Sequence, residues 1–399
     1  MLHSKLCRVM SLVYYHSVFF ALMGTTLRIR SYRKSIRLEK ASRSYLIYNF
    51  CVGIFLFWNI YYMVPQALVD GYIKYNIVLQ WNFFVMIILR ILAVLGCYVT
   101  IWLKRKEIIQ LYKNSLAYWK IFRKIIQVLV NKEDLEELQI TLARMMYRQI
   151  IVLYVGFMFS STIQYRLLSV INKQSLLALS ARLTHFLHFI AVKIGFYGML
   201  LLLNHQFLVI QLALNNLHQK KSGKKWKTLR SIASMHLETL QLARRIFSLY
   251  DIINTTVFIN MFMSTINILY HAVQFSNNTI KSDRWDILFG NGLIVSNIWG
   301  TLMLMNMLDR VVTSCNNIGQ TLRQFSDLPN VSKKLQRELE VFTIQLNRNH
   351  LVYKICGIVK LDKPAGLRYI ASILSNVIIL MQFDLRKQPQ PNIHHRYQA

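Results

Sequence analysis

Long runs of apolar residues, separated by basic connections, form the main pattern along this chain. The hydrocarbon core of a bilayer is about 30 Å thick, so a helix needs roughly 20 apolar residues to cross it. Seven runs have that length and composition, at residues 45–64, 78–103, 149–171, 183–214, 252–275, 287–308 and 366–383. The pattern therefore predicts an all-α, polytopic integral membrane protein with seven transmembrane helices.

The composition and charge of the chain agree with a membrane protein. Of its 399 residues, 54% are hydrophobic and only 16% are charged, whereas an average soluble chain is about 25% charged. The 48 Lys and Arg residues against 17 Asp and Glu give a net charge of +31, a balance also found in nucleic-acid-binding proteins. The apolar runs are too long for a soluble core, so we expect membrane lipid and no nucleic acid among the partners.

The distribution of basic residues predicts how the chain is oriented in the membrane. The segment before the first run and the connections after the second, fourth and sixth runs together hold 36 Lys and Arg residues, against 8 in the other connections and the tail. Under the positive-inside rule the N-terminus is cytoplasmic and the C-terminus extracellular. The glycosylation sequon at Asn277 then falls on an extracellular loop.

The connections on the basic side are long and have a helical pattern. Leu335, Leu339, Phe342 and Leu346 recur at spacings of four, three and four residues, which places them on one helix face. Two interpretations stay open: long cytoplasmic helical extensions that pack on each other within one chain, or a cytoplasmic anchor where several subunits meet. The short apolar segment 11–26 is followed by arginines, which favours a helix in the inner membrane interface over a signal peptide.

The last predicted helix carries the most specific motif of the chain. In the run CGIVKLDKPAGLRYIASILSNVIILMQFDL the residues in question are, in order, Ser375, Asn376, five apolar residues ending at Met381, Gln382 and Phe383. This run resembles the signature of insect gustatory receptors, in which Thr-Tyr, five apolar residues and Gln-Phe end the seventh span. Here Ser and Asn stand where that pattern has Thr and Tyr.

The resemblance implies a ligand-gated, non-selective cation channel, a tetramer whose seventh helices line the pore. It implies a gate near the extracellular end at Gln382 and Phe383, with Met381, Ser375 and Asn376 beside it. A bulky apolar ring can close a pore by dewetting, and a neutral amide can coordinate a passing cation weakly. The alternative is that Gln382 reaches toward the outer interface and Phe383 belongs to the aromatic belt.

These expectations divide the chain into five parts. They are a cytoplasmic N-terminal segment with an interfacial helix (1–44), six transmembrane helices with the ligand-pocket region (45–308), a cytoplasmic helical anchor connection (309–365), the pore-lining helix (366–383) and an extracellular tail (384–399). The resemblance also implies a homo- or heterotetramer of gustatory receptor subunits in the plasma membrane of gustatory receptor neurons. Its ligand would be a small-molecule tastant, by default a bitter or aversive one.

A ligand arriving from outside would meet the outer halves of the second to sixth helices. Aromatic rings and amides there suit small, partly apolar ligands. The candidates are Gln80, Trp81, Gln164, Tyr165, His188, Tyr270, Asn297 and Trp299. Each of these could instead form an interhelical hydrogen bond or belong to the aromatic belt.

Two basic residues, Arg90 and Lys193, fall within predicted spans that contain no Asp or Glu. A basic side chain at the centre of a span costs about 2.5–3.5 kcal/mol. Arg90 is therefore a candidate for the ligand pocket, where it would meet an anionic or polar group, or for a polar structural role. His185 and His188 share one helix face, but their span has no carboxylate or cysteine, so we expect neither a metal nor another cofactor.

Other classes of membrane protein fit the chain less well. A G-protein-coupled receptor has its N-terminus outside and an Asn-Pro-x-x-Tyr motif in its last span, which this chain lacks. A membrane enzyme would need carboxylates or clustered histidines within the spans, so no enzymatic activity is expected. An insect odorant receptor is the nearest alternative, because that family shares the implied topology and channel activity.

Overall fold

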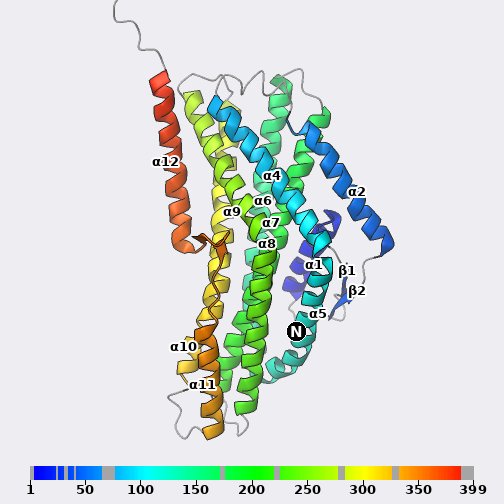
Figure 1. The fold of residues 1–399 in the computed structure, drawn as a ribbon, viewed down its shortest axis with the longest axis vertical. Helices are drawn as coiled ribbons and strands as arrows, with labels where there is room; N and C mark the ends of the chain where they lie inside the picture. Colours follow the sequence, from blue (N-terminus) through cyan, green and yellow to red (C-terminus); the bar gives the residue numbers. More distant parts are fainter. Residues whose placement is uncertain are drawn as a thin grey trace, which may run out of the picture.

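The computed structural model describes residues 4–23, 26–30, 35–39, 42–64, 77–170, 176–219, 225–276, 284–325 and 332–387. Its helices run side by side along one axis and form an elongated bundle (Figure 1). They are α1 (Ser4–Phe19), α2 (Arg43–Asn59), the 3-10 turn η1 (Ile60–Tyr62), α4 (Ile77–Leu103), α5 (Arg105–Leu129), α6 (Lys132–Val170), α7 (Leu176–Gln219), α8 (Lys225–Ser276), α9 (Arg284–Asn316), α10 (Ile318–Arg323), α11 (Lys333–Arg348) and α12 (Lys363–Lys387).

Seven of the described helices are long and apolar enough to cross a membrane, which confirms the predicted number. They are α2, α4, α6, α7, α8, α9 and α12. Three of them exceed any bilayer, because α6, α7 and α8 contain 39, 44 and 52 residues and a helix rises about 1.5 Å per residue. The extensions of α7 and α8 pack with α5, α10 and α11 in the lower part of Figure 1.

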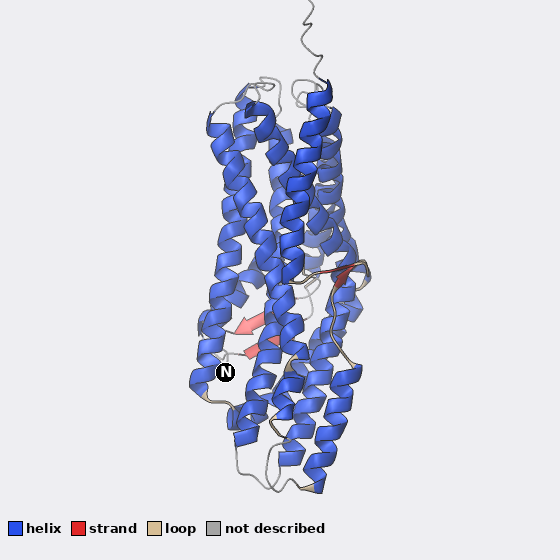
Figure 2. Ribbon diagram, turned by 90° about the vertical axis from the view of Figure 1, so that its left-hand side faces the viewer, coloured by secondary structure: helices blue, strands red, loops and turns tan. Residues whose placement is uncertain are grey.

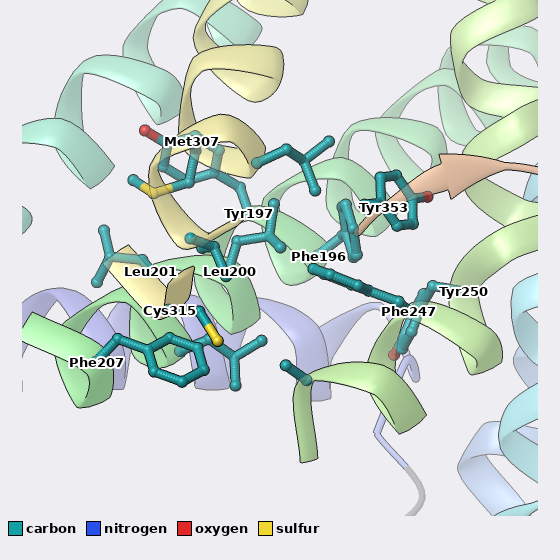
Figure 3. Close-up of a cluster of buried hydrophobic side chains, with 14 of the residues drawn as sticks. Phe196, Tyr197, Leu200, Leu201, Phe207, Phe247, Tyr250, Met307, Cys315 and Tyr353 are labelled. Atoms are coloured by element: carbon teal, nitrogen blue, oxygen red, sulfur yellow. The ribbon is translucent and has the colours of Figure 1, made fainter. Parts of the chain in front are cut away.

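The centre of the bundle is α7, which packs against α4, α6, α8 and α9. Figure 3 shows Phe196, Tyr197, Leu200 and Leu201 of α7 among side chains of α8 and α9, and all four are at most 1% exposed. Because α7 is apolar on every side, it can be enclosed completely. It is the axis around which the other helices are arranged.

The N-terminal helix α1 packs along α6 and α7, with Leu6 and Val9 fully buried. The Tyr98 hydroxyl of α4 donates to the Phe20 carbonyl oxygen at 2.7 Å and fixes the end of α1. An antiparallel pair of strands follows, β1 (Thr26–Arg30) and β2 (Ser35–Glu39). The strands are drawn in red in Figure 2. The sequence pattern did not predict this pair. The location of α1 in the inner interface stays a prediction.

The apolar stripe of α11 is covered by the same chain. Leu335, Phe342 and Leu346 are buried and Leu339 is half-buried against the main core. Gln345 on the neighbouring face donates from Nε2 to the Ala233 carbonyl oxygen of α8 at 3.3 Å. The structure therefore shows the packing that the intrachain interpretation requires, whereas a meeting of subunits at this end stays a prediction.

Candidate functional site

The last helix, α12, stands at the margin of the bundle and contacts only α8 and α9 closely (Figure 1). Its buried side consists of Ile373 and Val377, which pack with Ile266 of α8. The ring of Tyr369 lies 5.7 Å from that of Phe262. Because only this one side is packed, most of α12 is available to water, lipid or another subunit.

The exposed part of α12 has two different faces. On one, Leu367, Leu374 and Ile378 are 75%, 53% and 54% exposed, as suits a surface against lipid or a second helix. On the other, the exposed residues recur every three or four positions, which is one face of a helix. They are the polar residues Ser372, Ser375, Asn376 and Gln382, with the apolar Ile379 among them, and we refer to these five residues as the polar stripe.

Three of the five predicted gate residues lie on the polar stripe, namely Ser375, Asn376 and Gln382. The Asn376 side chain donates to the Ser372 carbonyl oxygen at 2.7 Å. Met381 lies on the packed side instead, half-buried against the cluster around Ile373. The backbone of Phe383 is part of α12, but its side chain lies outside the described residues.

The polar stripe also contains two residues that the sequence motif missed, Ser372 and Ile379. Ser372 lies three residues before Ser375 and four before Asn376, a spacing that could have revealed it because such positions share a helix face. Spacing could not have revealed Ile379, because Ile378 is also three residues from Ser375 and lies on the apolar face. The sequon at Asn277 lies outside the described residues. The gate candidates thus form a longer surface than the terminal Gln-Phe pair indicated.

The base of α12 is held by polar contacts. A short strand pair, β3 (Lys354–Ile355) and β4 (Val359–Lys360), leads into the helix. Asp362 then accepts a hydrogen bond from the Ala365 amide at 2.9 Å and pairs with Lys360 at 3.3 Å and Arg368 at 3.6 Å. Beside it lies a cavity of about 210 Å³ between α9 and these strands.

The charge of Asp362 contributes to this arrangement. Burial acts to raise the pKa of Asp362, but the Ala365 hydrogen bond and the positive charges of Lys360 and Arg368 outweigh burial, so the pKa lies below its ordinary value. A carboxylate with a lowered pKa stabilises the folded state above its ordinary pKa, and the stabilisation is lost as the pH falls through the lowered value. The start of α12 is therefore fixed at neutral pH.

We expect Asp362→Ala to lower stability by about 1 kcal/mol, because it removes the N-cap of α12. Asp362→Asn can still cap the helix but has no charge, so its loss should be smaller. Thermal unfolding of the purified protein between pH 7 and pH 3 measures both. The difference between wild type and Asp362→Asn should shrink toward acid, and a difference independent of pH would contradict the role of the charge.

The predicted ligand residues lie in different environments of the protomer. Arg90, His188 and Tyr270 are buried, and three amides are half-buried, namely Gln80, Gln164 and Asn297. The aromatic residues Trp81, Tyr165 and Trp299 are 65%, 63% and 57% exposed on the outside of the bundle. The cavity beside Asp362 and a second one of about 210 Å³ between α5 and α8 contain none of the nine.

The interior between α4 and α7 is the best-defined polar region among these candidates. The guanidinium of Arg90 lies over the Phe186 ring, 4.8 Å from its centroid. His185 donates from Nε2 to the Leu56 carbonyl oxygen at 2.9 Å, and His188 donates from Nδ1 to the Thr184 carbonyl oxygen at 2.9 Å. Within the described residues no group of three or more His, Cys, Asp or Glu is placed to bind a metal.

Seven membrane-length helices around a central, enclosed α7, with a thinly packed last helix, describe a polytopic membrane protein. A family model described as "7tm Chemosensory receptor" matches residues 10–387. The chain is 68% identical to putative gustatory receptor 58b of Drosophila melanogaster, over all of this chain and 97% of that protein. The chain therefore belongs to the insect gustatory receptor family, as the motif predicted, and this family is one of receptors and not of enzymes.

Two more distant relatives extend the comparison. The chain is 24% identical over 148 residues to gustatory receptor for bitter taste 22e of Drosophila melanogaster, which is 36% of this chain and 37% of that protein. The structure resembles that of the insect olfactory receptor OR5 from Machilis hrabei with a TM-score of 0.67 and 11% identity, over 94% of this chain and 97% of that chain. At that identity the likeness shows a shared fold and nothing more. It therefore supports an olfactory-receptor fold for this chain, but not the function of an odorant receptor.

Proposed function

We propose that this protein is a taste receptor that acts as a ligand-gated, non-selective cation channel in the plasma membrane of gustatory receptor neurons. The observation that carries the proposal is the polar stripe of α12. In the proposed assembly, a homo- or heterotetramer, four copies of α12 surround a central axis and turn their polar stripes toward it. The N-terminus is cytoplasmic and the C-terminus extracellular, as the charge distribution predicts.

The chemistry of the polar stripe supports a water-filled path. A helix surface that faces lipid is apolar, because polar side chains have no partner in hydrocarbon. Ser375, Asn376 and Gln382 are exposed, whereas the face with Leu374 and Ile378 is apolar. The apolar face can pack against lipid or a neighbouring subunit while the polar stripe contacts water.

The residues of the stripe also suit conduction of cations without strong selectivity. Hydroxyl and amide oxygens replace part of the hydration shell of a cation, and their lack of charge lets the ion leave again. Gln382 and Phe383 at the end of the helix act as the gate in this proposal. The Phe383 ring closes the path by dewetting, and the Gln382 amide contacts the ion when the path is open.

A bitter or otherwise aversive tastant is the ligand that we propose. A relative whose name assigns it to bitter taste supports this choice, together with the mixture of half-buried amides and buried aromatic residues in α4 to α9. Tyr270 is fully buried, and Gln164 has a buried Oε1 without a hydrogen-bond partner. Such amides among rings can orient a small, partly apolar molecule.

The proposal is tested in cells that express the chain with a C-terminal epitope tag. We expect the antibody to stain intact cells, and denatonium, quinine or caffeine to evoke a current that reverses near 0 mV in physiological solutions. Staining of surface-expressed protein only after permeabilisation would contradict the orientation. Normal surface staining without any evoked current, also when the relative putative gustatory receptor 58b is co-expressed, would contradict the channel. Cells that express the tag on an unrelated single-span protein serve as the staining control.

A further inference from the structure

Arg90 of α4 and Lys193 of α7 are buried in the interior of the bundle, with exposures of 8% and 5%. Each lies over an aromatic ring of α7. The Arg90 guanidinium is 4.8 Å from the Phe186 centroid, and the Lys193 ammonium is 5.3 Å from the Phe189 centroid. A ring face can attract a cation, but it neutralises none of the charge.

These two charges repel each other and have further basic neighbours. Lys193, Arg182 and His185 each lie close enough to Arg90 for electrostatic repulsion between the two basic groups. The helices α2, α4 and α7 contain no Asp or Glu at all. These three helices therefore offer Arg90 no carboxylate, and the charged groups that act on it within the described residues are basic.

Arg90 also has unused hydrogen-bonding capacity. Its buried Nε has no hydrogen-bond partner, and the Phe186 ring covers a face of the guanidinium and not its N–H donors. Buried charges in proteins are normally paired and hydrogen-bonded, since an isolated one is costly. The planar fork of Arg fits a carboxylate with two parallel hydrogen bonds, and a nearby Lys adds a second positive charge.

We propose that Arg90 and Lys193 form a binding site for a monovalent anion inside the bundle. The anion is either chloride or the carboxylate of an acidic ligand, because both supply the negative charge that the site lacks. The chloride case is independent of the proposed taste function. The carboxylate case rests on it and assigns the receptor to organic acids or acidic glycosides among its tastants.

Thermal unfolding of the full-length protein in nanodiscs of zwitterionic lipid tests this site. In a chloride-free sulfate buffer of constant ionic strength, we expect chloride or benzoate to raise Tm saturably by about 2–5 °C. Benzamide has the shape of benzoate without its charge, so it should have no effect. A rise with chloride but not with benzoate assigns an inorganic anion, and a rise with benzoate but not with chloride assigns a carboxylate. If both raise Tm and their effects do not add, the two anions share one site.

Variants of the same protein separate a site from a general salt effect. Arg90→Met should abolish the rise in Tm. Arg90→Lys and Lys193→Met should each weaken anion binding and so raise the half-saturating anion concentration by about tenfold or more. Arg144→Met, at an exposed position of α6, is the matched control and should keep the wild-type response.

The inference is overturned if neither anion raises Tm, or if the rise persists in Arg90→Met. Should Arg90→Met fail to fold, the responses of Arg90→Lys and Lys193→Met decide, because both keep a side chain of similar length. Since unfolding requires no channel activity, an anion response without tastant-evoked current would leave this site intact and contradict only the proposed function.

Discussion

Cysteine introduced at Ser375, Asn376 or Gln382 should react with a positively charged thiosulfonate reagent added in water, and the reaction should remove most of the tastant-evoked current. The reason is the position of these residues on the polar stripe of α12. A thiol reacts as the thiolate, which forms in water and not in hydrocarbon. A charged group attached there would also repel cations along the path.

The apolar face of α12 supplies the matched control for this experiment. Leu374 and Ile378 are 53% and 54% exposed in the protomer, and they alternate with the stripe along the same helix turns. Cysteine at these positions should react slowly and leave the current nearly unchanged. The background should carry Ser in place of the exposed native residues Cys51 and Cys356. Equal reaction on both faces, or none on the stripe, would contradict a pore lined by α12.

The number and approximate limits of the spans could be predicted from the sequence because they depend on length and apolar content alone. The prediction of α7 at residues 183–214 is an example, since the observed helix Leu176–Gln219 contains it. Family membership was predictable for a different reason, because the motif ending at Gln382 and Phe383 is local in sequence. Neither prediction required knowledge of which helix side faces which neighbour.

The ligand candidates were less predictable because their positions depend on the rotation of each helix about its axis. In α4 the residues 83–89 between Trp81 and Arg90 are apolar on all sides of the helix, so the sequence gives no indication that Trp81 points outward and Arg90 inward. Packing against α7 and α8 fixes that rotation. In α12 the direction of the polar face could have been read from the sequence, since the polar residues Ser372, Ser375 and Asn376 lie three and four positions apart within an apolar run.

The second large effect is expected at the contact between α6 and α9 around Gly156. Gly156 of α6 faces Ser296 of α9, and a Cβ at Gly156 would clash with the Ser296 Oγ and lie 3.4 Å from its Cβ. Small residues at such crossings let helix backbones approach within a membrane protein, where packing drives the association. The contact between α6 and α9 is among the most extensive in the bundle, so a larger side chain there disturbs the whole receptor.

Gly156→Leu should therefore destabilise the protein by about 1–3 kcal/mol, because overpacking forces the two helices apart. The measurement is the Tm of the purified protein together with its monodisperse yield. Gly53→Leu is the matched control, since a Cβ at Gly53 meets only the Tyr98 ring, at 3.9 Å, and α2 is exposed over most of its length. If both variants unfold at the wild-type temperature, α6 and α9 do not pack as tightly at Gly156 as the structure shows, and the prediction is contradicted. If only Gly156→Leu unfolds early, the crossing at Gly156 holds the bundle that supports α12.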